Sequence, residues 1–259
     1  MTPDFAPLAR ELDQWRAREC QATLWWRDDD ATCDSPQLRY LVALAQGEDA
    51  PIALAAIPAA IKPSLAAAID HCAQVTIVQH GYAHHNHAPV GERGWELGAH
   101  RPLVSMLAEL SEGRRVLEEE FGDRFVPMLV PPWNRIDASV VASLPATGMV
   151  ALSTFGPRAQ RHAANGVAYC NTHVDPIAWK SGRTFIGGEK VVARIVDHLT
   201  ARREGRLDAD EATGLLTHHL NFDAPAFAFL AQLLAWTRTR GEVRWLDARE
   251  LIVISSRSA

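Results

Sequence analysis

ATLWWRDDD, residues 22–30, places three adjacent aspartates directly after a short apolar run of strand-forming residues. Three further apolar runs end in the same way, with histidine, proline, tryptophan or asparagine immediately behind them. They are residues 74–79 before His80, residues 126–130 before Pro131 and residues 214–217 before His218. In β/α barrels the carboxyl ends of the strands share one face, and the active site is built there. These four segments are therefore expected to meet at one pocket.

Apolar runs and amphipathic stretches alternate over the rest of the chain as well. The strand candidates are residues 22–27, 52–57, 74–79, 126–130, 149–153, 167–172, 214–217 and 243–245. The helix candidates are residues 3–20, 35–45, 64–69, 102–120, 138–144, 189–203, 224–239 and 248–253. Alternation of this kind implies βα units and a mainly parallel sheet. We expect an α/β fold, a distorted (β/α) barrel of about seven strands, with an open parallel sheet as the alternative.

Length and composition bound the class of protein. The chain has 259 residues, of which 47% are hydrophobic and 22% charged, so one sizeable core is expected and long disorder is not. We expect a single domain over residues 1–259, because no repeat, low-complexity tract or Pro/Gly-rich linker stands out. The net charge of −5 and the pI of about 6.1 argue against a nucleic-acid partner, since phosphate binding favours a basic surface.

The amino terminus and the cysteines bear on the compartment. Residues 1–20 lack the basic start and the continuous apolar run of a signal peptide. The longest apolar stretch, residues 51–61, is about half a membrane span and contains Pro58. The cysteines are far apart and form no CxxC pair, so free thiols are expected at Cys20, Cys33, Cys72 and Cys170. We expect a cytoplasmic protein with no membrane partner.

The acidic cluster Asp28–Asp30 is costly beside an apolar strand. Its carboxylates repel one another and need a compensating cation. A divalent metal ion supplies that charge, with help from Arg27. The alternative is a solvated acidic loop leading to a helix N-cap near Ser35, which the flanking Trp25 and Trp26 disfavour.

The segment His80–His87 holds four of the 11 histidines of the chain. Neutral imidazole is a good zinc ligand, and a local pair of ligands lowers the entropy cost of assembling a site. We expect His80 and His84 to coordinate the metal from a loop, with Gly81 allowing a tight turn. A set of one aspartate and two histidines leaves coordination positions open, which favours catalysis over a closed structural site. The alternative is a histidine-rich surface loop.

Two further segments add residues to the expected pocket. Pro132, Trp133 and Asn134 form a rigid turn in which the Trp133 amide can face an oxyanion; a proline-stiffened turn before a helix explains the same letters. His218 is a candidate general acid, because the pKa of imidazole lies near neutral pH; a hydrogen-bonded core histidine is the alternative. Trp179 is expected to line a sugar-sized cleft, against the alternative of a buried core tryptophan.

In their order along the chain, these motifs resemble those of the polysaccharide deacetylase family, which is carbohydrate esterase family four, with its chitooligosaccharide deacetylase homology domain. The resemblance runs from Asp28 to His219. WRDDD is similar to the first motif of the family, TFDDG, which implies that Asp28 is the general base and Asp29 a metal ligand. A shift by one residue, with Asp29 as the base and Asp30 as the ligand, stays open.

Two other motifs of the family have clear counterparts here. HGYAH is similar to the H-[ST]-x-x-H motif, which implies that His80 and His84 are metal ligands, with Gly81 in place of the usual Ser or Thr. LLTH is similar to the last motif, a hydrophobic run that ends in the general acid, which implies this role for His218. His219 then stands where many members have Asp.

The third and fourth motifs are matched only in part. VPPW resembles RxPY but lacks the arginine that orients the base in the family, and Arg27 or Arg135 is its candidate replacement. The fourth motif is similar only through Asp175 and Trp179. These departures bear on the substrate more than on the metal.

The resemblance implies a metal-dependent hydrolase that removes an acetyl or similar acyl group from an N-acetylated sugar or related amide. The implied cofactor is Zn²⁺ or another divalent transition metal, and the partner is a carbohydrate or a small N-acylated substrate. One alternative is an inactive carbohydrate- or metal-binding protein of the same fold, which the missing arginine favours. Another is a metal hydrolase of the amidohydrolase type, because His85-Asn86-His87 matches the H-x-H motif of such enzymes.

Overall fold

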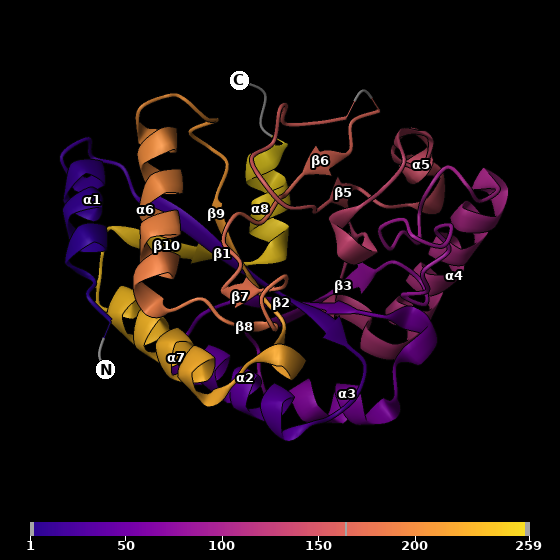
Figure 1. Cartoon of the computed structure of the whole chain (residues 1–259), viewed down its shortest axis with the longest axis horizontal. Helices are drawn as coiled ribbons and strands as arrows, with labels where there is room; N and C mark the ends of the chain where they lie inside the picture. Colours follow the sequence, from indigo (N-terminus) through magenta and orange to yellow (C-terminus); the bar gives the residue numbers. More distant parts are fainter. Residues whose placement is uncertain (1–2, 164, 257–259) are drawn as a thin grey trace.

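The structure is a computed structural model that describes residues 3–163 and 165–256. Within these residues, eight parallel strands form one sheet surrounded by helices (Figure 1). The strands are β1 (Ala22–Ala31), β2 (Ile52–Ala56), β3 (Val75–His80), β4 (Phe125–Val130), β5 (Ala151–Leu152), β6 (Ala168–Tyr169), β9 (Thr213–Thr217) and β10 (Val243–Leu246). Each of them lies where the sequence predicts a strand.

Seven of the strands follow one another as a distorted barrel in the order β9-β1-β2-β3-β4-β5-β6. The ring closes through isolated bridges, which join Phe155 to Thr172 and Val174 to Leu215. β10 pairs only with residues 22–25 of β1 and so lies outside the ring. The distortion is concentrated at β5 and β6, which have two residues each. The predicted distorted (β/α) barrel is confirmed, and the open sheet is not found.

Helices cover the outside of the sheet at the positions the sequence predicts. They are α1 (Ala6–Arg16), α2 (Pro36–Gly47), α3 (Pro63–Ile69), α4 (Leu103–Phe121), α5 (Ala138–Ser143), α6 (Gly188–Arg203), α7 (Ala224–Arg238) and α8 (Ala248–Ser255). In Figure 1, α4 and α5 lie on the right, α2 and α3 along the bottom, and α1 beside α6 on the left. None of the described helices is both long enough and apolar enough to cross a membrane.

The two faces of β1 enter different parts of the core. Trp26 belongs to the layer between the sheet and the helices, whereas Trp25 packs with Ala53 and Ala55 of β2 and Val78 of β3 in a second cluster. Side chains alternate along a strand, so Arg27 and Asp29 continue the face of Trp25. The alanines leave space on that face for the large side chains of β1. The free thiols predicted for the cysteines are confirmed.

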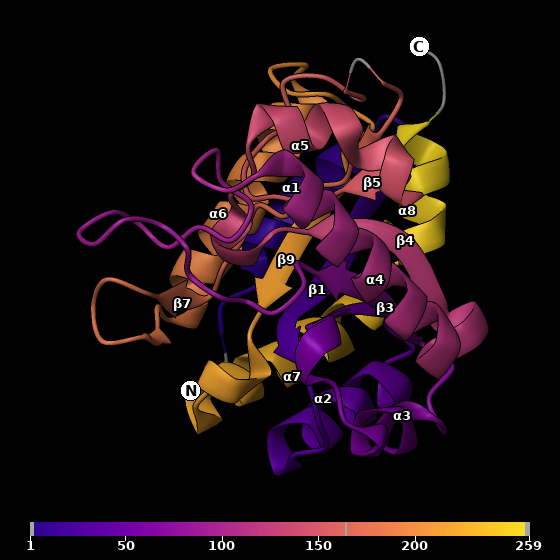
Figure 2. The same ribbon diagram turned by 90° about the vertical axis from the view of Figure 1, so that its right-hand side faces the viewer.

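A short antiparallel hairpin, β7 (Ile177–Ala178) with β8 (Thr184–Phe185), lies outside the barrel sheet and was not predicted from the sequence. Figure 2 shows this hairpin and the loop between β3 and α4 projecting on the same side of the molecule. The hairpin carries Trp179, and the loop carries His84. Two excursions from the barrel therefore flank the carboxyl ends of its strands.

Candidate active site

The acidic cluster lies inside β1 and not in a loop behind it. β1 pairs with β2 through Asp28 and again through Ala31, with a register shift between them. Asp30, inside this irregularity, has a φ of 73°. A bulge of this kind breaks the alternation of side chains along a strand. As a result, Asp29 and Asp30 both line one pocket, although they are adjacent in the sequence.

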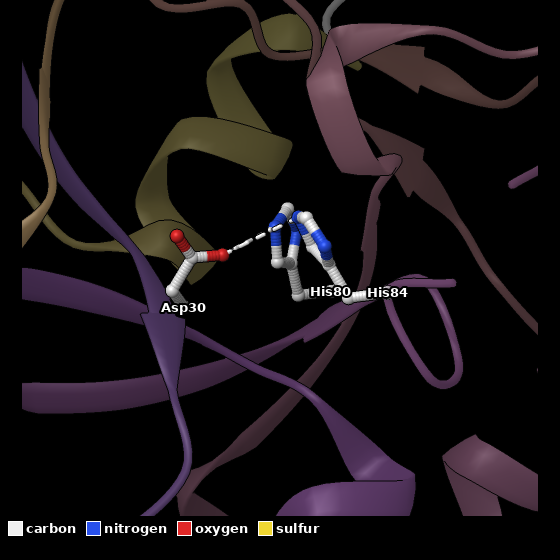
Figure 3. A group of neighbouring side chains, drawn as sticks. All are labelled: Asp30, His80 and His84. Carbon is white, nitrogen blue, oxygen red and sulfur yellow. Dashed lines mark ion pairs between the residues drawn. The ribbon is translucent and has the colours of Figure 1, made fainter. Parts of the chain in front are cut away.

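Asp30, His80 and His84 point toward one another in that pocket (Figure 3). Asp30 Oδ1 lies 3.2 Å from His80 Nε2 and 3.5 Å from His84 Nε2. His80 is the last residue of β3, and His84 lies four residues further on with a φ of 56°. Left-handed backbone at a residue other than glycine is uncommon and concentrates at functional sites.

The hydrogen bonding of His80 prepares it for a metal ion. Its Nδ1 lies 3.0 Å from the carbonyl oxygen of Val130. A carbonyl only accepts, so Nδ1 carries a proton, and Nε2 is the nitrogen that faces Asp30 and His84 and would bind the ion. The three ligand atoms lie within 4.8 Å of one another. Two imidazole nitrogens and one carboxylate oxygen, with open positions left over, fit a divalent transition metal.

The charges of these groups are coupled. Burial acts to raise the pKa of Asp30, but the hydrogen bond and charge of His80 and the charges of His218 and His84 outweigh it, and the pKa lies well below its usual range. Burial acts to lower the pKa of His80, but the carboxylates of Asp29 and Asp30 raise it on balance. The carboxylate therefore stays ionised, as a metal ligand must be.

Arg27 holds the carboxylate of Asp29. The Arg27 Nε lies 2.8 Å from Asp29 Oδ1 in an ion pair, and Nη2 donates a hydrogen bond to Oδ2 at 3.0 Å. The guanidinium is completely buried and is itself fixed by Ser153 Oγ at 2.6 Å and Asn134 Oδ1 at 2.8 Å. A charged hydrogen bond together with a second close contact to the same carboxylate sets the orientation of both groups. Of the two arginines considered as replacements, Arg135 bonds instead to the carbonyl oxygen of Gly94.

His218 and Trp179 lie on the other side of Asp29. His218 Nε2 lies 3.9 Å from Asp29 Oδ2. The Trp179 ring contacts the His218 ring edge-on at 4.6 Å between centroids, and its Nε1 donates to Asp175 at 2.6 Å. Burial raises the pKa of Asp175, and the hydrogen bond from Trp179 offsets part of that rise. Trp179 is 40% exposed, so it is a rim residue and not a core tryptophan.

These side chains line a pocket of about 690 Å³. Its wall also holds the exposed aromatic rings of Trp133 and Phe155, and Trp133 packs on His84 at 4.4 Å between centroids. A cavity of about 800 Å³ adjoins it at Asn134 and Arg135, but none of the described residues lining that cavity is an aspartate, a glutamate or a histidine. Of these two cavities, only the smaller is lined by carboxylates and imidazoles of the described residues.

Comparisons with known proteins give a likeness in structure only. No family model matches the sequence, and no curated protein matches it significantly. A protein from Mycobacterium smegmatis, assigned as a polysaccharide deacetylase, matches with a TM-score of 0.63 and 15% identity over 90% of this chain and 89% of its own. The fold is that of the polysaccharide deacetylases.

Two further solved structures of this fold bear on the site. A family 4 acetyl xylan esterase from Clostridium thermocellum, in complex with cobalt, has a TM-score of 0.57 and 12% identity over 90% of this chain and 91% of its own. A mutant of BA3943, a pseudoenzyme of carbohydrate esterase family four, has a TM-score of 0.55 and 14% identity over 90% of this chain and 67% of its own. The deacetylase fold thus includes both enzymes and pseudoenzymes, and the residues of the pocket have to decide between them.

Within this deacetylase fold, Asp28 faces away from the pocket. Its carboxylate is completely buried and accepts hydrogen bonds from Thr217 Oγ1 at 2.6 Å and from the His219 amide at 3.0 Å, while His219 Nδ1 lies 2.5 Å from it. Of the two registers that the sequence left open, the structure brings Asp29 and Asp30 to the pocket, and not Asp28 and Asp29. The cause is the alternation of β1, which turns Asp28 outward, combined with the bulge, which turns Asp30 inward.

Seven of the nine predicted site residues line the pocket. They are Asp29, His80, His84, Trp133, Asn134, Trp179 and His218. Pro132 does not line it but is buried against the turn that follows His80, where a Cβ on Gly81 would come within 2.6 Å of the proline ring. Gly81 also has a φ of 54°, which explains why glycine stands where the family has Ser or Thr.

The carboxylate of Glu96 fixes the loop that carries His84, and the sequence analysis did not identify this residue. It is 1% exposed and accepts from the amides of Tyr82 at 3.1 Å and Ala83 at 2.8 Å. The same carboxylate leaves no room for a Cβ on Gly81. The sequence around Glu96 gives no sign of its link to the loop of His84, because the hydrogen bonds join the two ends of an irregular loop.

A second group of three side chains offers metal ligands among the described residues, namely His173, His198 and Glu211. The two imidazole rings stack at 3.7 Å between centroids with an angle of 26°. His173 Nδ1 accepts from the amide of Gly214 at 2.9 Å, so its proton is on Nε2, which lies 3.1 Å from Glu211. Burial lowers the pKa of His173 to about 3 and of His198 to about 2, and raises that of Glu211 to about 7.

Proposed function

We propose that the chain is a metal-dependent deacetylase of the polysaccharide deacetylase family, acting on an N-acetylated sugar or a related amide. One observation carries the proposal. The three candidate metal ligands, the clamped carboxylate of Asp29 and the imidazole of His218 line a single pocket. A metal, a base and an acid on different sides of one cavity are the parts that amide hydrolysis needs.

Asp30, His80 and His84 would hold the metal ion, which we propose to be zinc or another divalent transition metal. When bound, such an ion supplies a Lewis acid for the carbonyl oxygen of the amide. The protein fixes the tautomer of His80 through the Val130 carbonyl, and it fixes the loop of His84 through Glu96. These contacts orient the ligands before the ion arrives.

We assign the base role to Asp29. Both of its oxygens contact Arg27, and the pair is nearly inaccessible from outside the pocket. The clamp aims the carboxylate, so that one oxygen is placed to accept the proton of an attacking water. Arg27 therefore takes the part of the arginine that VPPW lacks, although it comes from the same strand as the base.

His218 is placed to protonate the leaving nitrogen. Its Nε2 faces Asp29 and the pocket, and its ring is held edge-on by Trp179. An amide nitrogen leaves as a neutral amine only if it gains a proton, so an imidazole at this position serves as the general acid. Trp133, Asn134 and Trp179 line the space where the rest of the substrate would lie.

The alternatives from the sequence lose their main support. The inactive binding protein rested on the missing arginine, and Arg27 now occupies that role. The amidohydrolase reading rested on His85 and His87, and neither belongs to the ligand group or lines the pocket among the described residues.

A pair of neighbouring substitutions tests the proposal. We expect Asp29→Asn to retain about one metal ion per chain and to lose acetate release from an N-acetylated chitooligosaccharide by roughly 10²–10⁴-fold, because the general base is gone. Asp28→Asn is the matched control, since it removes the adjacent carboxylate, which faces His219 instead of the pocket. We expect it to lower stability while the folded protein keeps its turnover within about tenfold.

Metal content is measured by elemental analysis and turnover by acetate release. Loss of turnover in Asp28→Asn but not in Asp29→Asn would assign the role of general base to Asp28. Absence of acetate release from every N-acetylated substrate by the metal-loaded wild type would favour the binding protein.

A further inference from the structure

Three arginines line the candidate active-site pocket, and the mechanism above uses none of them. Arg135 follows the short turn Pro132–Asn134, Arg183 lies beside strand β8 of the hairpin, and Arg194 is on α6. They come from three separate elements, so their meeting at one cavity is a product of the tertiary fold. Three aspartates line the same pocket, namely Asp29, Asp30 and Asp175, so the partners of each charge decide whether positive charge is in excess.

None of the three guanidinium groups forms an ion pair with a carboxylate of the described chain. Arg135 Nη1 donates to the carbonyl oxygen of Gly94 at 2.8 Å, and Arg194 Nη1 donates to the carbonyl oxygen of Asp175 at 2.8 Å. These bonds orient the two side chains but leave their charge uncompensated. Several solvent-exposed arginines elsewhere do pair with acids, as Arg16 does with Asp13 and Arg115 with Glu112.

The aspartates of the pocket have interaction partners other than these three arginines. Asp29 is already matched by Arg27, and Asp30 faces His80 and His84. The carboxylate of Asp175 accepts from Trp179 Nε1 at 2.6 Å and from the Ile177 amide at 2.8 Å. Both donors are neutral, so Asp175 offsets the charge of at most one arginine, and at least two of the three arginines leave spare positive charge at the wall of the pocket.

We infer that the substrate of this pocket carries an oxyanion group, a carboxylate or a phosphate, beside the amide that reacts. The inference rests on the proposed function, since it takes the pocket to be the substrate site. Guanidinium groups bind both kinds of oxyanion through paired N–H donors. The exposed rings of Trp133, Phe155 and Trp179 supply flat apolar faces in the same wall. A ring that bears both an acetamide and an anionic group matches this combination.

Binding of matched probes tests the inference separately from turnover. N-acetylglucosamine is the neutral probe, its 6-phosphate the phosphate probe, and N-acetylmuramic acid the carboxylate probe. Trp133 and Trp179 line the pocket, so tryptophan fluorescence of the metal-loaded protein reports binding. At low ionic strength we expect at least one anionic probe to bind about tenfold more tightly than the neutral one, with the preference shrinking as salt rises.

Arg183→Met is the main variant, because Arg183 lines the pocket and its side chain forms no hydrogen bond or ion pair within the described part of the chain. We expect it to reduce the anion preference to about threefold or less, and Arg194→Met to act in the same direction. Arg10→Met is the control, since it removes an exposed arginine of α1 that does not line the pocket. A preference for only one anionic probe identifies the group. Equal binding of all three probes, or a preference that survives in both pocket variants, overturns the inference.

The two proposals fail in different ways. If the neutral sugar binds as well as the anionic ones and is deacetylated, the oxyanion inference is wrong and the enzyme assignment stands. If the anionic probes bind more tightly through Arg183 but no acetate is released from any of them, the enzyme assignment is wrong and the oxyanion site stands.

Discussion

Asp30, His80 and His84 form one group of two histidines and a carboxylate, and His173, His198 and Glu211 form another. The first group lines the pocket, whereas none of the second group does. In the first, a backbone carbonyl holds a proton of His80 on Nδ1, so Nε2 is the nitrogen that faces Asp30 and the pocket. In the second, a backbone amide occupies Nδ1 of His173 and forces the proton onto Nε2, which faces the carboxylate.

The difference lies in the backbone groups around the imidazoles and not in the residue types. A lone pair on an imidazole nitrogen lies in the plane of the ring, so two nearly parallel rings stacked at 3.7 Å do not aim at a common point. The rings of His80 and His84 are inclined by 48° at 5.1 Å between centroids. We therefore expect an ion in the first group and a hydrogen-bonded, neutral pair of rings in the second.

The largest expected effect separates the two groups by metal content. Asp30→Ala removes the carboxylate ligand, and we expect the metal affinity to fall by more than about 100-fold, with acetate release lost in parallel. Glu211→Gln changes the carboxylate of the second group while keeping its shape, and we expect about one metal ion per chain to remain. Elemental analysis after dialysis measures both. Loss of the ion in Glu211→Gln with retention in Asp30→Ala would reverse the comparison.

A smaller effect on metal affinity is expected from changing Glu96, which orients the loop of His84 in the first group. Glu96→Gln weakens the hydrogen bonds that fix the loop of His84, because a neutral amide accepts less strongly than a carboxylate. We expect metal affinity to fall by about 10–100-fold, as for other residues that orient ligands. Competition with a chelating dye measures the affinity. Glu112→Gln, on the exposed face of α4, is the control and should leave it unchanged.

The smallest effect concerns the stability of the second group toward acid. The pKa of His173 is about 3 and that of His198 about 2 in the folded chain, mainly through burial, with Arg202 adding to it in both. An ordinary histidine in the unfolded chain takes up a proton near pH 6.5. Between pH 6.5 and about 3 the unfolded state thus binds more protons at these positions, and stability falls as the pH falls.

Glu211 acts in the opposite direction. Its pKa is raised to about 7 by burial, so the folded state holds a proton that the unfolded state releases above its ordinary pKa of 4.5. The two histidines together bind more protons in the unfolded state than the one glutamate binds in the folded state. The net effect of the three groups is therefore that the folded protein still loses stability as the pH falls. We expect His198→Asn to flatten the dependence by about 1.4 kcal/mol per pH unit between pH 6 and 5, measured by urea unfolding. His71→Asn, at an exposed histidine, is the control; an equal change in both would remove the second group as the cause.

Much of the site was predictable because strand ends are predictable. The apolar runs before Asp28, His80 and His218 mark the buried parallel strands, and the barrel brings their carboxyl ends to one face. The β7–β8 hairpin was not predicted, since its strands have two residues each and their pairing depends on the turn between them. Glu96 was missed for a related reason, because its contact with the histidine loop follows from an irregular backbone path.

The sequence by itself determined the fold class, the order of the strands along the chain and the residue types at the pocket, because burial periods and strand ends are local properties of the chain. The tertiary structure alone decided which aspartates face the pocket, since the pairing of β1 with β2 places a bulge at Asp30. It also decided that Arg27 is fixed against Asp29 and that His80 presents Nε2, because Ser153 and Val130, which hold these two side chains, come from distant parts of the chain. The sequence determines which residue types reach the pocket, but contacts with residues distant in sequence fix how their side chains are oriented.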